Sequence, residues 1–417
     1  MQERPNDVQT PEKKKTSTAK KSSAAATSVK KPNVKKPAGK KSDGKKTAGT
    51  KKKTGHKTSG KKSARLRAEQ KAKKLRSRKR WRLVGRIVGR VALFAFVLVV
   101  AVVVGLYLVL DVFFHGPSQT AGDNMAMSLF ETSAAKFVPS LYYSDEEIAE
   151  LKERNKTVEI KEETDTNLIV IAPPVTEEEA VQQENDGFVD GIKVEEIKGA
   201  TYHGWMMTVL DPSRVMLGVS ADWFDDNVGG LRIEKLAEKY NAVAAINGGS
   251  FNDGGGQGNG GMPNGVTVTQ GKVCNSHGGA DLITVGFDQN NVLIVGKMTK
   301  KQAEERGIRD ACSFGPALVV NGVGAETKGT SSGLNPRTAI GQRADGAVLM
   351  LVIDGRQVNS LGANIADLVE IMLSYGAVNA CNLDGGSSSN IYYNGEMLND
   401  GVAITGARRI PTAFVVR

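Results

Sequence analysis

The longest apolar run of the chain covers residues 91–110 and contains no charged side chain. A helix of this length, at ~1.5 Å per residue, crosses a hydrocarbon core of ~30 Å. A cleaved signal peptide has a shorter apolar run, so the pattern favours a single-pass signal anchor. A buried core helix is the alternative. Arginines and lysines precede the run and Asp111 follows it. The positive-inside rule therefore predicts a cytoplasmic N-terminus, with residues 111–417 outside the cell membrane.

Beyond residue 188 the apolar pattern predicts two strand–helix–strand units. In residues 364–375 apolar side chains from Ile365 to Leu373 recur at the spacing of one helix face. The strand before that helix, residues 347–353, is almost continuously apolar, which is typical of a strand covered on both faces. The six elements are strand 215–220, helix 231–240, strand 242–246, strand 347–353, helix 364–375 and strand 378–383.

Other short apolar stretches bounded by turn residues predict more strands, with a hairpin around residues 288–291. Strands and helices in this order predict an α/β domain with a mixed sheet. The additional strands are residues 282–287, 292–295, 317–320, 337–342, 389–393 and 412–416.

The same pattern divides the chain into four parts. Ser144 begins a capping-box sequence, which predicts a short helix ending near Arg154 within an otherwise solvated spacer. The parts are a disordered basic cytoplasmic tail (1–82), a transmembrane signal anchor with its basic flank (83–112), an extracellular stalk (113–187) and a folded domain (188–417).

Charge separates the tail from the rest of the chain. Residues 1–90 contain 32 Lys and Arg against 5 Asp and Glu, whereas the remaining residues contain 24 against 40. The tail has almost no aromatic residues and cannot bury a core, so we expect a disordered segment. Anionic lipid is a candidate partner of the tail. Nucleic acid is less favoured, because no folded nucleic-acid-binding motif accompanies the charge. The three cysteines exclude a disulfide framework.

Two segments, residues 240–250 and 375–387, end alike, with a short apolar strand, a polar residue and Gly-Gly-Ser. A glycine pair lets backbone N–H groups approach a ligand closely. The polar residue of each segment stands at the carboxyl end of a predicted strand, where open α/β sheets bind ligands. We expect one site built from both corners, with an anion cradle at the serines. Its candidate residues are Asn247, Gly248, Gly249, Asp384, Gly385, Gly386, Ser387 and Ser388.

Two carboxylates follow the strands of the second unit. Asp354 comes after the first strand and Asp384 after the second, so parallel pairing would leave both at one sheet edge. Strands ~4.8 Å apart would allow the ~5 to 9.5 Å separations of glycosidase carboxylates. An ordinary turn is the alternative for Asp354. Both carboxylates, with Asp253 and Asp281, could instead hold Ca²⁺ or Mg²⁺, although no EF-hand spacing supports this.

Arg337 and Thr338 form a further candidate site in the sequence Asn-Pro-Arg-Thr. Arginine presents a fork of donors that matches phosphate, and the threonine hydroxyl could add another donor. An exposed loop arginine is the alternative. Arg409 is a second candidate for a phosphate contact, with a surface basic residue as its alternative.

Five short motifs occur in order along the domain, at residues 245–252, 335–341, 352–356, 362–368 and 382–388. Through them, residues 190–417 resemble the phosphodiester glycosidase family. The resemblance implies that family's catalytic domain, and hydrolysis of a sugar-1-phosphodiester at its glycosidic bond. The resemblance places the family's Asn-Gly-Gly motif at residues 247–249 and its Asp-Gly-Gly motif at residues 384–386. It places the Pro-Arg-Thr motif at residues 336–338. Bacterial members of the family are associated with exopolysaccharide.

These observations predict a membrane-anchored extracellular glycosidase that acts on GlcNAc-1-phosphodiester-like bonds of cell-wall or exopolysaccharide material. Asp384 and Asp354 are expected near the anomeric carbon, without assignment of nucleophile or base. Arg337 and the serine hydroxyls are expected on the phosphate. A non-catalytic, surface-anchored glycan-binding protein of the same fold is the alternative. A protein that chiefly tethers DNA or lipid through its tail ranks last.

Overall fold

The computed structural model describes residues 59–417 apart from 174–175, 223, 225–226, 255–257, 280–281 and 400–407. Most of the predicted basic tail, and the candidate ligand Asp281, lie outside the described residues. The chain divides into two units, residues 1–88 and 89–417, and the folded domain belongs to the second.

Helix α1 (Ser59–His115) contains the predicted apolar span. Among the described residues one helix, within Lys62–His115, is long and apolar enough to cross a membrane. Its side chains along residues 91–109 are exposed, so the span is no core helix of the folded domain. Length and composition therefore support a membrane anchor or signal anchor at this position.

The predicted α/β class is confirmed, and the described strands form three sheets. The first contains, in spatial order, β1 (Ile192–Lys198), β2 (His203–Val209), β13 (Val348–Ile353), β12 (Arg337–Arg343), β14 (Ala377–Leu383), β10 (Ala317–Val320) and β11 (Val323–Gly324). The second contains β16 (Glu396–Met397), β15 (Ile391–Tyr393), β4 (Ala244–Asn247), β17 (Thr412–Val416) and β3 (Val215–Val219). The third contains β6 (Lys272–Asn275), β5 (Thr267–Thr269), β9 (Ile308–Phe314), β7 (Ile283–Asp288) and β8 (Leu293–Gly296).

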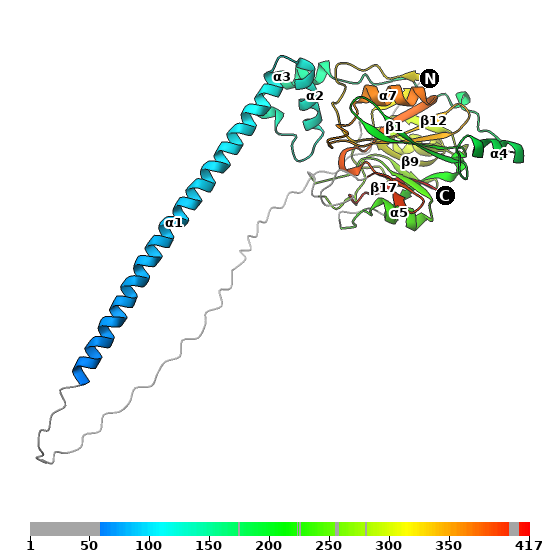
Figure 1. Cartoon of the computed structure of the whole chain (residues 1–417). Coiled ribbons are helices and arrows are strands. Elements are labelled where there is room, and N and C mark those ends of the chain that lie inside the picture. The colour runs from blue at the N-terminus through cyan, green and yellow to red at the C-terminus, as the bar shows by residue number, and fades with distance from the viewer. Residues whose placement is uncertain are drawn as a thin grey trace, which may run out of the picture. The chain divides into compact units, whose positions relative to one another are not determined.

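Helices cover the outer faces of the first two sheets. Figure 1 shows α7 (Ile365–Ser374) and α5 (Ile233–Tyr240) on opposite sides of the stacked sheets. Alternate residues of β13 divide between two cores: Leu349 and Leu351 pack with α7, while Val348, Met350 and Val352 face the core shared with the other sheets. The prediction of a strand covered on both faces is thus confirmed. The other described helices are α2 (Gln119–Phe130), α3 (Asp145–Arg154), α4 (Glu177–Asn185) and α6 (Lys300–Glu305).

Both predicted strand–helix–strand units are present, but each is split by an antiparallel strand. In the first sheet β12 lies between β13 and β14, and in the second β17 lies between β3 and β4. The prediction that the strands of a unit pair directly in parallel is wrong, since all strand pairings among the described residues are antiparallel. A local hairpin explains the first case. A short turn joins β12 to β13, so β12 pairs with the edge of β13 at which β14 was expected, and β14 pairs with the other edge of β12.

Part of the predicted stalk packs against the domain. The capping box at Ser144 is present and starts α3, as predicted. Beyond α3, Asn155 Oδ1 accepts hydrogen bonds from Thr330 N (2.7 Å) and Thr330 Oγ1 (3.0 Å). Further on, Val170 N donates to Ala344 O (2.9 Å). The expectation of a solvated spacer is therefore wrong for this stretch, because its backbone and polar side chains are paired with loops of the domain.

Candidate active site

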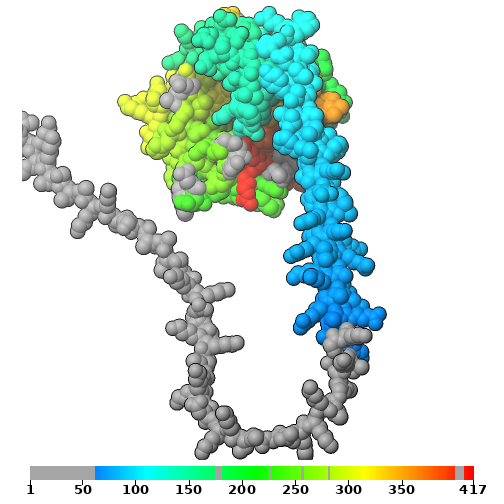
Figure 2. Space-filling model, turned by 90° about the vertical axis from the view of Figure 1, so that its left-hand side faces the viewer, coloured from blue at the N-terminus to red at the C-terminus, as the bar shows by residue number. Residues whose placement is uncertain are grey.

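A cavity of about 740 Å³ opens where four parts of the chain meet. These are the turn after α2, the loop after β4, the start of β12 and the end of β14, with the arginines before β17 beside them. Figure 2 shows the turquoise segment that includes α2 on the same face of the molecule as the red C-terminal residues. The charged lining residues are Glu131, Arg232, Asp253, Arg337, Arg356, Asp384, Arg408 and Arg409.

Asp384 is the carboxylate at the end of β14. Its backbone N donates to Gly248 O (3.1 Å), and its Oδ1 accepts from Gly385 N (3.1 Å). Burial raises the pKa of Asp384 to about 6, against the opposing effects of the Ser388 hydroxyl and the Arg408 guanidinium. A carboxyl group with this pKa changes protonation near neutral pH, which suits acid–base or nucleophilic chemistry.

The Asn-Gly-Gly corner lies behind the cavity wall. Asn247 is fully buried, and its Nδ2 donates to Asp384 O (2.7 Å). Its Oδ1 accepts from Thr338 Oγ1 (2.7 Å) and from Asn390 N (3.2 Å). Both glycines donate hydrogen bonds to Thr412. Gly248 N donates to the carbonyl oxygen of Thr412 (3.0 Å), and Gly249 N donates to its hydroxyl (3.1 Å). This corner, with Thr338, thus fixes the backbone that carries Asp384 and does not line the cavity.

The Asp-Gly-Gly corner reaches the cavity as predicted. Gly385, Gly386 and Ser387 line the cavity, whereas Ser388 is fully buried. Gly386 has φ +62°, and a Cβ placed on it would lie 3.4 Å from Arg356 Nη1. Glycine therefore allows an arginine to rest close over this turn.

Arg356 is a cavity residue that the sequence analysis did not select. It has φ +57°, an uncommon backbone conformation for a side-chain-bearing residue and one that is often retained at functional sites. Its Nη2 donates to Asn335 Oδ1 (2.9 Å). Burial lowers the pKa of Arg356, and the neighbouring Arg337 charge adds to this effect, so two guanidinium groups share one side of the cavity.

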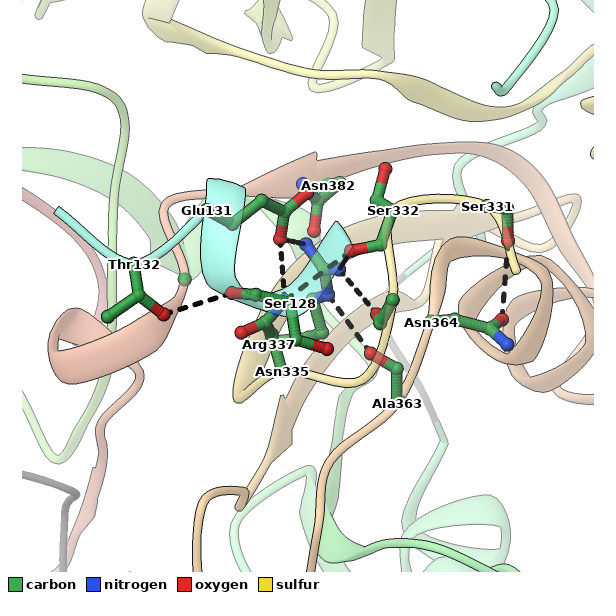
Figure 3. A network of polar contacts seen from close by, with 12 residues as sticks. Ser128, Glu131, Thr132, Ser331, Ser332, Asn335, Arg337, Ala363, Asn364 and Asn382 are labelled. Atoms are coloured by element: carbon green, nitrogen blue, oxygen red, sulfur yellow. Dashed lines mark hydrogen bonds and ion pairs between the residues drawn. The ribbon is translucent and has the colours of Figure 1, made fainter. Parts of the chain in front are cut away.

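Arg337 lines the cavity from the start of β12, but most of its donors are engaged by backbone carbonyls. Nε donates to Ala363 O (3.1 Å), and Nη2 donates to Gly333 O (3.0 Å) and to Ser332 O (3.3 Å). Its Nη1 forms an ion pair with Glu131 Oε2 (2.8 Å), as Figure 3 shows. Arg337 is 5% exposed, so the exposed-loop alternative is wrong.

Glu131 follows α2 and extends from the predicted stalk into the site. Besides Arg337, its Oε2 accepts a hydrogen bond from Asn335 Nδ2 (2.9 Å). Burial raises the pKa of Glu131 despite these partners. No sequence signal identified this residue, because it lies more than 200 positions before its partners and outside the resemblance to the family.

Arg408, Asp253 and Arg409 also line the cavity. Arg408 Nη2 lies 3.4 Å from Asp253 Oδ2, and its guanidinium stacks 4.8 Å from the ring centre of Phe251. Asp253 Oδ2 also accepts a hydrogen bond from Ser133 Oγ (2.7 Å). Arg409 is exposed, and its Nη1 donates to Gly230 O (3.3 Å). Arg408 is thus the basic residue among these three whose charge acts on Asp384.

Asp354 does not line the cavity. It is buried, its Oδ1 accepts from Asn399 Nδ2 (3.0 Å), and its Oδ2 lies 3.3 Å from His203 Nδ1. Since β12 separates β13 from β14, the strand ends that carry Asp354 and Asp384 are roughly 10 Å apart, twice the spacing of neighbouring strands. The expectation of two carboxylates on adjacent strands is therefore wrong.

The predicted metal alternative gains no geometric support from the part of the chain that the structure describes. That part contains no group of three or more His, Cys, Asp or Glu side chains placed to hold a metal ion. Among the four aspartates considered, Asp253 and Asp384 line the cavity and Asp354 is engaged elsewhere.

Comparisons with known proteins agree with the resemblance found in the motifs. Residues 240–417 match the family model described as phosphodiester glycosidase. The SPbeta prophage-derived uncharacterized protein YomE of Bacillus subtilis is 37% identical over 99 residues, covering 23% of this chain and 15% of that protein. The N-acetylglucosamine-1-phosphodiester alpha-N-acetylglucosaminidase of Bos taurus is 25% identical over 183 residues, covering 40% and 34%. The chain thus spans at most about a third of these relatives.

Among solved structures, the catalytic domain of the zebrafish N-acetylglucosamine-1-phosphodiester alpha-N-acetylglucosaminidase, auto-inhibited by its pro-peptide, aligns with a TM-score of 0.45 and 21% identity. The alignment covers 54% of this chain and 82% of that one. The family match at residues 240–417 supports a glycosidase-type function for the domain.

Proposed function

Starting from a domain that matches the phosphodiester glycosidases, we propose that this chain hydrolyses the glycosidic bond of sugar-1-phosphodiesters in cell-wall or exopolysaccharide material outside the cell. The observation that carries the proposal is a carboxyl group of raised pKa, Asp384, in a cavity whose lining includes five arginines. A carboxylate suits the positive charge that develops at an anomeric carbon, and guanidinium groups suit a phosphodiester.

In the proposed reaction the bond between the anomeric carbon and the phosphate oxygen breaks, and water supplies the hydroxyl of the released sugar. Asp384, ionised above pH of about 6, stabilises the oxocarbenium-like transition state or attacks the anomeric carbon. Breaking this bond leaves its electron pair, and so a second negative charge, on the phosphate monoester, and the proton lost by water passes to the solvent. Phosphate is a good leaving group, so it needs little acid assistance. The charge of Arg408 acts on Asp384, so its guanidinium lies near enough to stabilise the phosphate as it leaves.

Two roles are reassigned in this proposal. Asp253 is a cavity carboxylate, as Glu131 is, and its charge raises the pKa of Asp384 further. Asp354, held by Asn399 and His203, positions the end of β13 and the turn that carries Arg356. This role is supported by its burial away from the cavity.

The location outside the cell membrane is also part of the proposal. Its support is the apolar span of α1 and the excess of basic residues on its N-terminal side. Treating intact cells with protease tests it: residues 111–417 are digested and the tail is protected. Protection of the folded domain would contradict the proposed orientation.

The activity is tested with the full chain in detergent and a GlcNAc-α-1-phosphodiester, chosen because the Bos taurus relative carries that substrate in its name. Free sugar is measured, and a panel of other sugar-1-phosphodiesters follows. Release of sugar from any member supports the enzyme. Binding of the panel without release would favour the glycan-binding alternative.

A further inference from the structure

The cavity contains an anion subsite that the chain fills with its own carboxylate. Glu131 Oε2 lies 2.8 Å from Arg337 Nη1 and 2.9 Å from Asn335 Nδ2. The charge of Arg356 also acts on this carboxylate. Figure 3 shows Glu131 directed at the guanidinium of Arg337. Two arginines and one carboxylate meet here, so the subsite without Glu131 would carry two positive charges.

The subsite is rigid on the arginine side. Three backbone carbonyls fix Arg337, and they leave Nη1 directed at Glu131. Asn335 links Arg356 to Glu131, since its Oδ1 accepts from Arg356 and its Nδ2 donates to Glu131. Donors held in this way suit a carboxylate or a phosphate without reorganisation.

Glu131 is itself held in place by the helices next to it. Asp123 of α2 accepts hydrogen bonds from Arg154 of α3 (2.7 and 2.9 Å) and from Asn155 Nδ2 (2.8 Å). Asn155 in turn bonds to the loop of the domain at Thr330. This network, buried except at Arg154, fixes α2 beside the loop that holds Arg337, and it makes Glu131 part of the cavity wall.

We infer that Glu131 sets the charge selectivity of the cavity, an inference that rests on the proposed function. By filling the Arg337–Arg356 subsite, it leaves the substrate the remaining lining arginines, Arg232, Arg408 and Arg409, for its phosphodiester. A substrate with a second anionic group, a phosphate monoester, is rejected because that group meets the carboxylate of Glu131. The cavity thus selects substrates with a single negative charge.

The test compares two substrates on the full chain: a GlcNAc-1-phosphoglycerol diester, and the same diester with a terminal phosphate monoester. Glu131→Gln keeps the side-chain shape and removes the charge. We expect the ratio of kcat/KM for the second substrate to that for the first to rise by about tenfold, equivalent to ~1.4 kcal/mol. Glu370→Gln, an exposed residue of α7, is the matched control and leaves the ratio unchanged.

Two outcomes would overturn the inference. An equal gain on both substrates would show that Glu131 only obstructs the cavity. An equal loss on both would show a purely structural or catalytic role. In either case the ratio stays constant although the rates change.

Binding of inorganic phosphate, measured by calorimetry, tests the subsite without any turnover. We expect Glu131→Gln to bind phosphate about tenfold more tightly than the parent chain. Adding Arg356→Gln removes this gain, because the remaining subsite has lost one cation. Unchanged phosphate affinity in Glu131→Gln would overturn the inference. The binding measurement can be read even if no sugar-1-phosphodiester is hydrolysed. Failure of the inference is therefore distinguishable from failure of the proposed function.

Discussion

The two Gly-Gly-Ser corners resemble each other in sequence and differ in position. Both follow the second strand of a split strand–helix–strand unit, β4 in one sheet and β14 in another. Asn247 of the first corner is fully buried and both ends of its amide are hydrogen-bonded, whereas Asp384 lines the cavity. They touch directly, through Asn247 Nδ2 to Asp384 O and Asp384 N to Gly248 O.

This difference shows that the Gly-Gly-Ser motif determines the shape of the turn, whereas the residues packed around the turn determine whether it supports the fold or takes part in the chemistry. A buried asparagine whose amide has backbone and hydroxyl partners supports an adjacent turn, and a charged residue there would be costly. The aspartate stands where the cavity allows partial access to solvent, so it can ionise. We therefore treat the first corner as the support and the second as the chemical site.

The largest effect is expected from removing the charge of the chemical corner. Asp384→Asn should lower kcat for sugar release by at least about 10³-fold, since the general base or nucleophile is lost while the shape is kept. Asp345→Asn, in the exposed turn between β12 and β13, is the matched control. An Asp384→Asn variant with full activity would remove the distinction between the corners.

The next effect concerns the phosphate side of the same corner. Arg408→Gln should lower kcat/KM by about 10²-fold, because a charge-assisted contact to the leaving phosphate is lost. The ion pair of Arg343 with Asp345 is exposed and remote, so Arg343→Gln serves as its control. Equal kinetics for both variants would place the phosphate elsewhere in the cavity.

The supporting corner should show its effect in stability. Asn247→Ala removes the donor to Asp384 O and the acceptor of Thr338 and Asn390, so the free energy of unfolding should fall by about 2–4 kcal/mol. Denaturant titration measures it, with the exposed Asn290→Ala as the control. A loss of kcat at unchanged stability would make Asn247 part of the chemical site.

The smallest effect is the dependence on pH. The pKa of Asp384 is raised from 3.8 to about 6, so the folded chain holds a proton that the unfolded chain has already lost. Stability relative to Asp384→Asn should therefore fall as pH rises from about 4 to about 6, by on the order of 2 kcal/mol. Over the same window kcat/KM should rise as the carboxylate forms. Flat profiles for both quantities would contradict the assigned pKa shift.

Much of the fold followed from local patterns. The periodic apolar positions of α7, the continuous apolar strand β13 and the capping box at Ser144 each depend on neighbouring residues along the chain. Strand order did not follow, because an apolar strand gives no sign of which strand lies beside it. The inserted strands β12 and β17 therefore separated elements that we expected to pair.

The residues of the site were predictable where glycine or proline turn motifs stand next to them in the sequence. Asp384 and Arg337 stand in motifs with turn residues, and both reach the cavity. Arg356 could have been suspected from the Asp-Gly before it. Glu131 and Arg408 could not, because their roles arise from contacts between segments distant in sequence. Asp354 was misplaced relative to Asp384 by the same error in strand order.

The central claim is that, of the two carboxylates predicted from the sequence, Asp384 performs the chemistry and Asp354 supports the fold. Measuring kcat for sugar release by Asp384→Asn and Asp354→Asn side by side, at equal folded fraction, tests it most directly. We predict a loss of at least about 10³-fold for Asp384→Asn and of less than about tenfold for Asp354→Asn. A folded Asp354→Asn variant with the larger loss would contradict the claim.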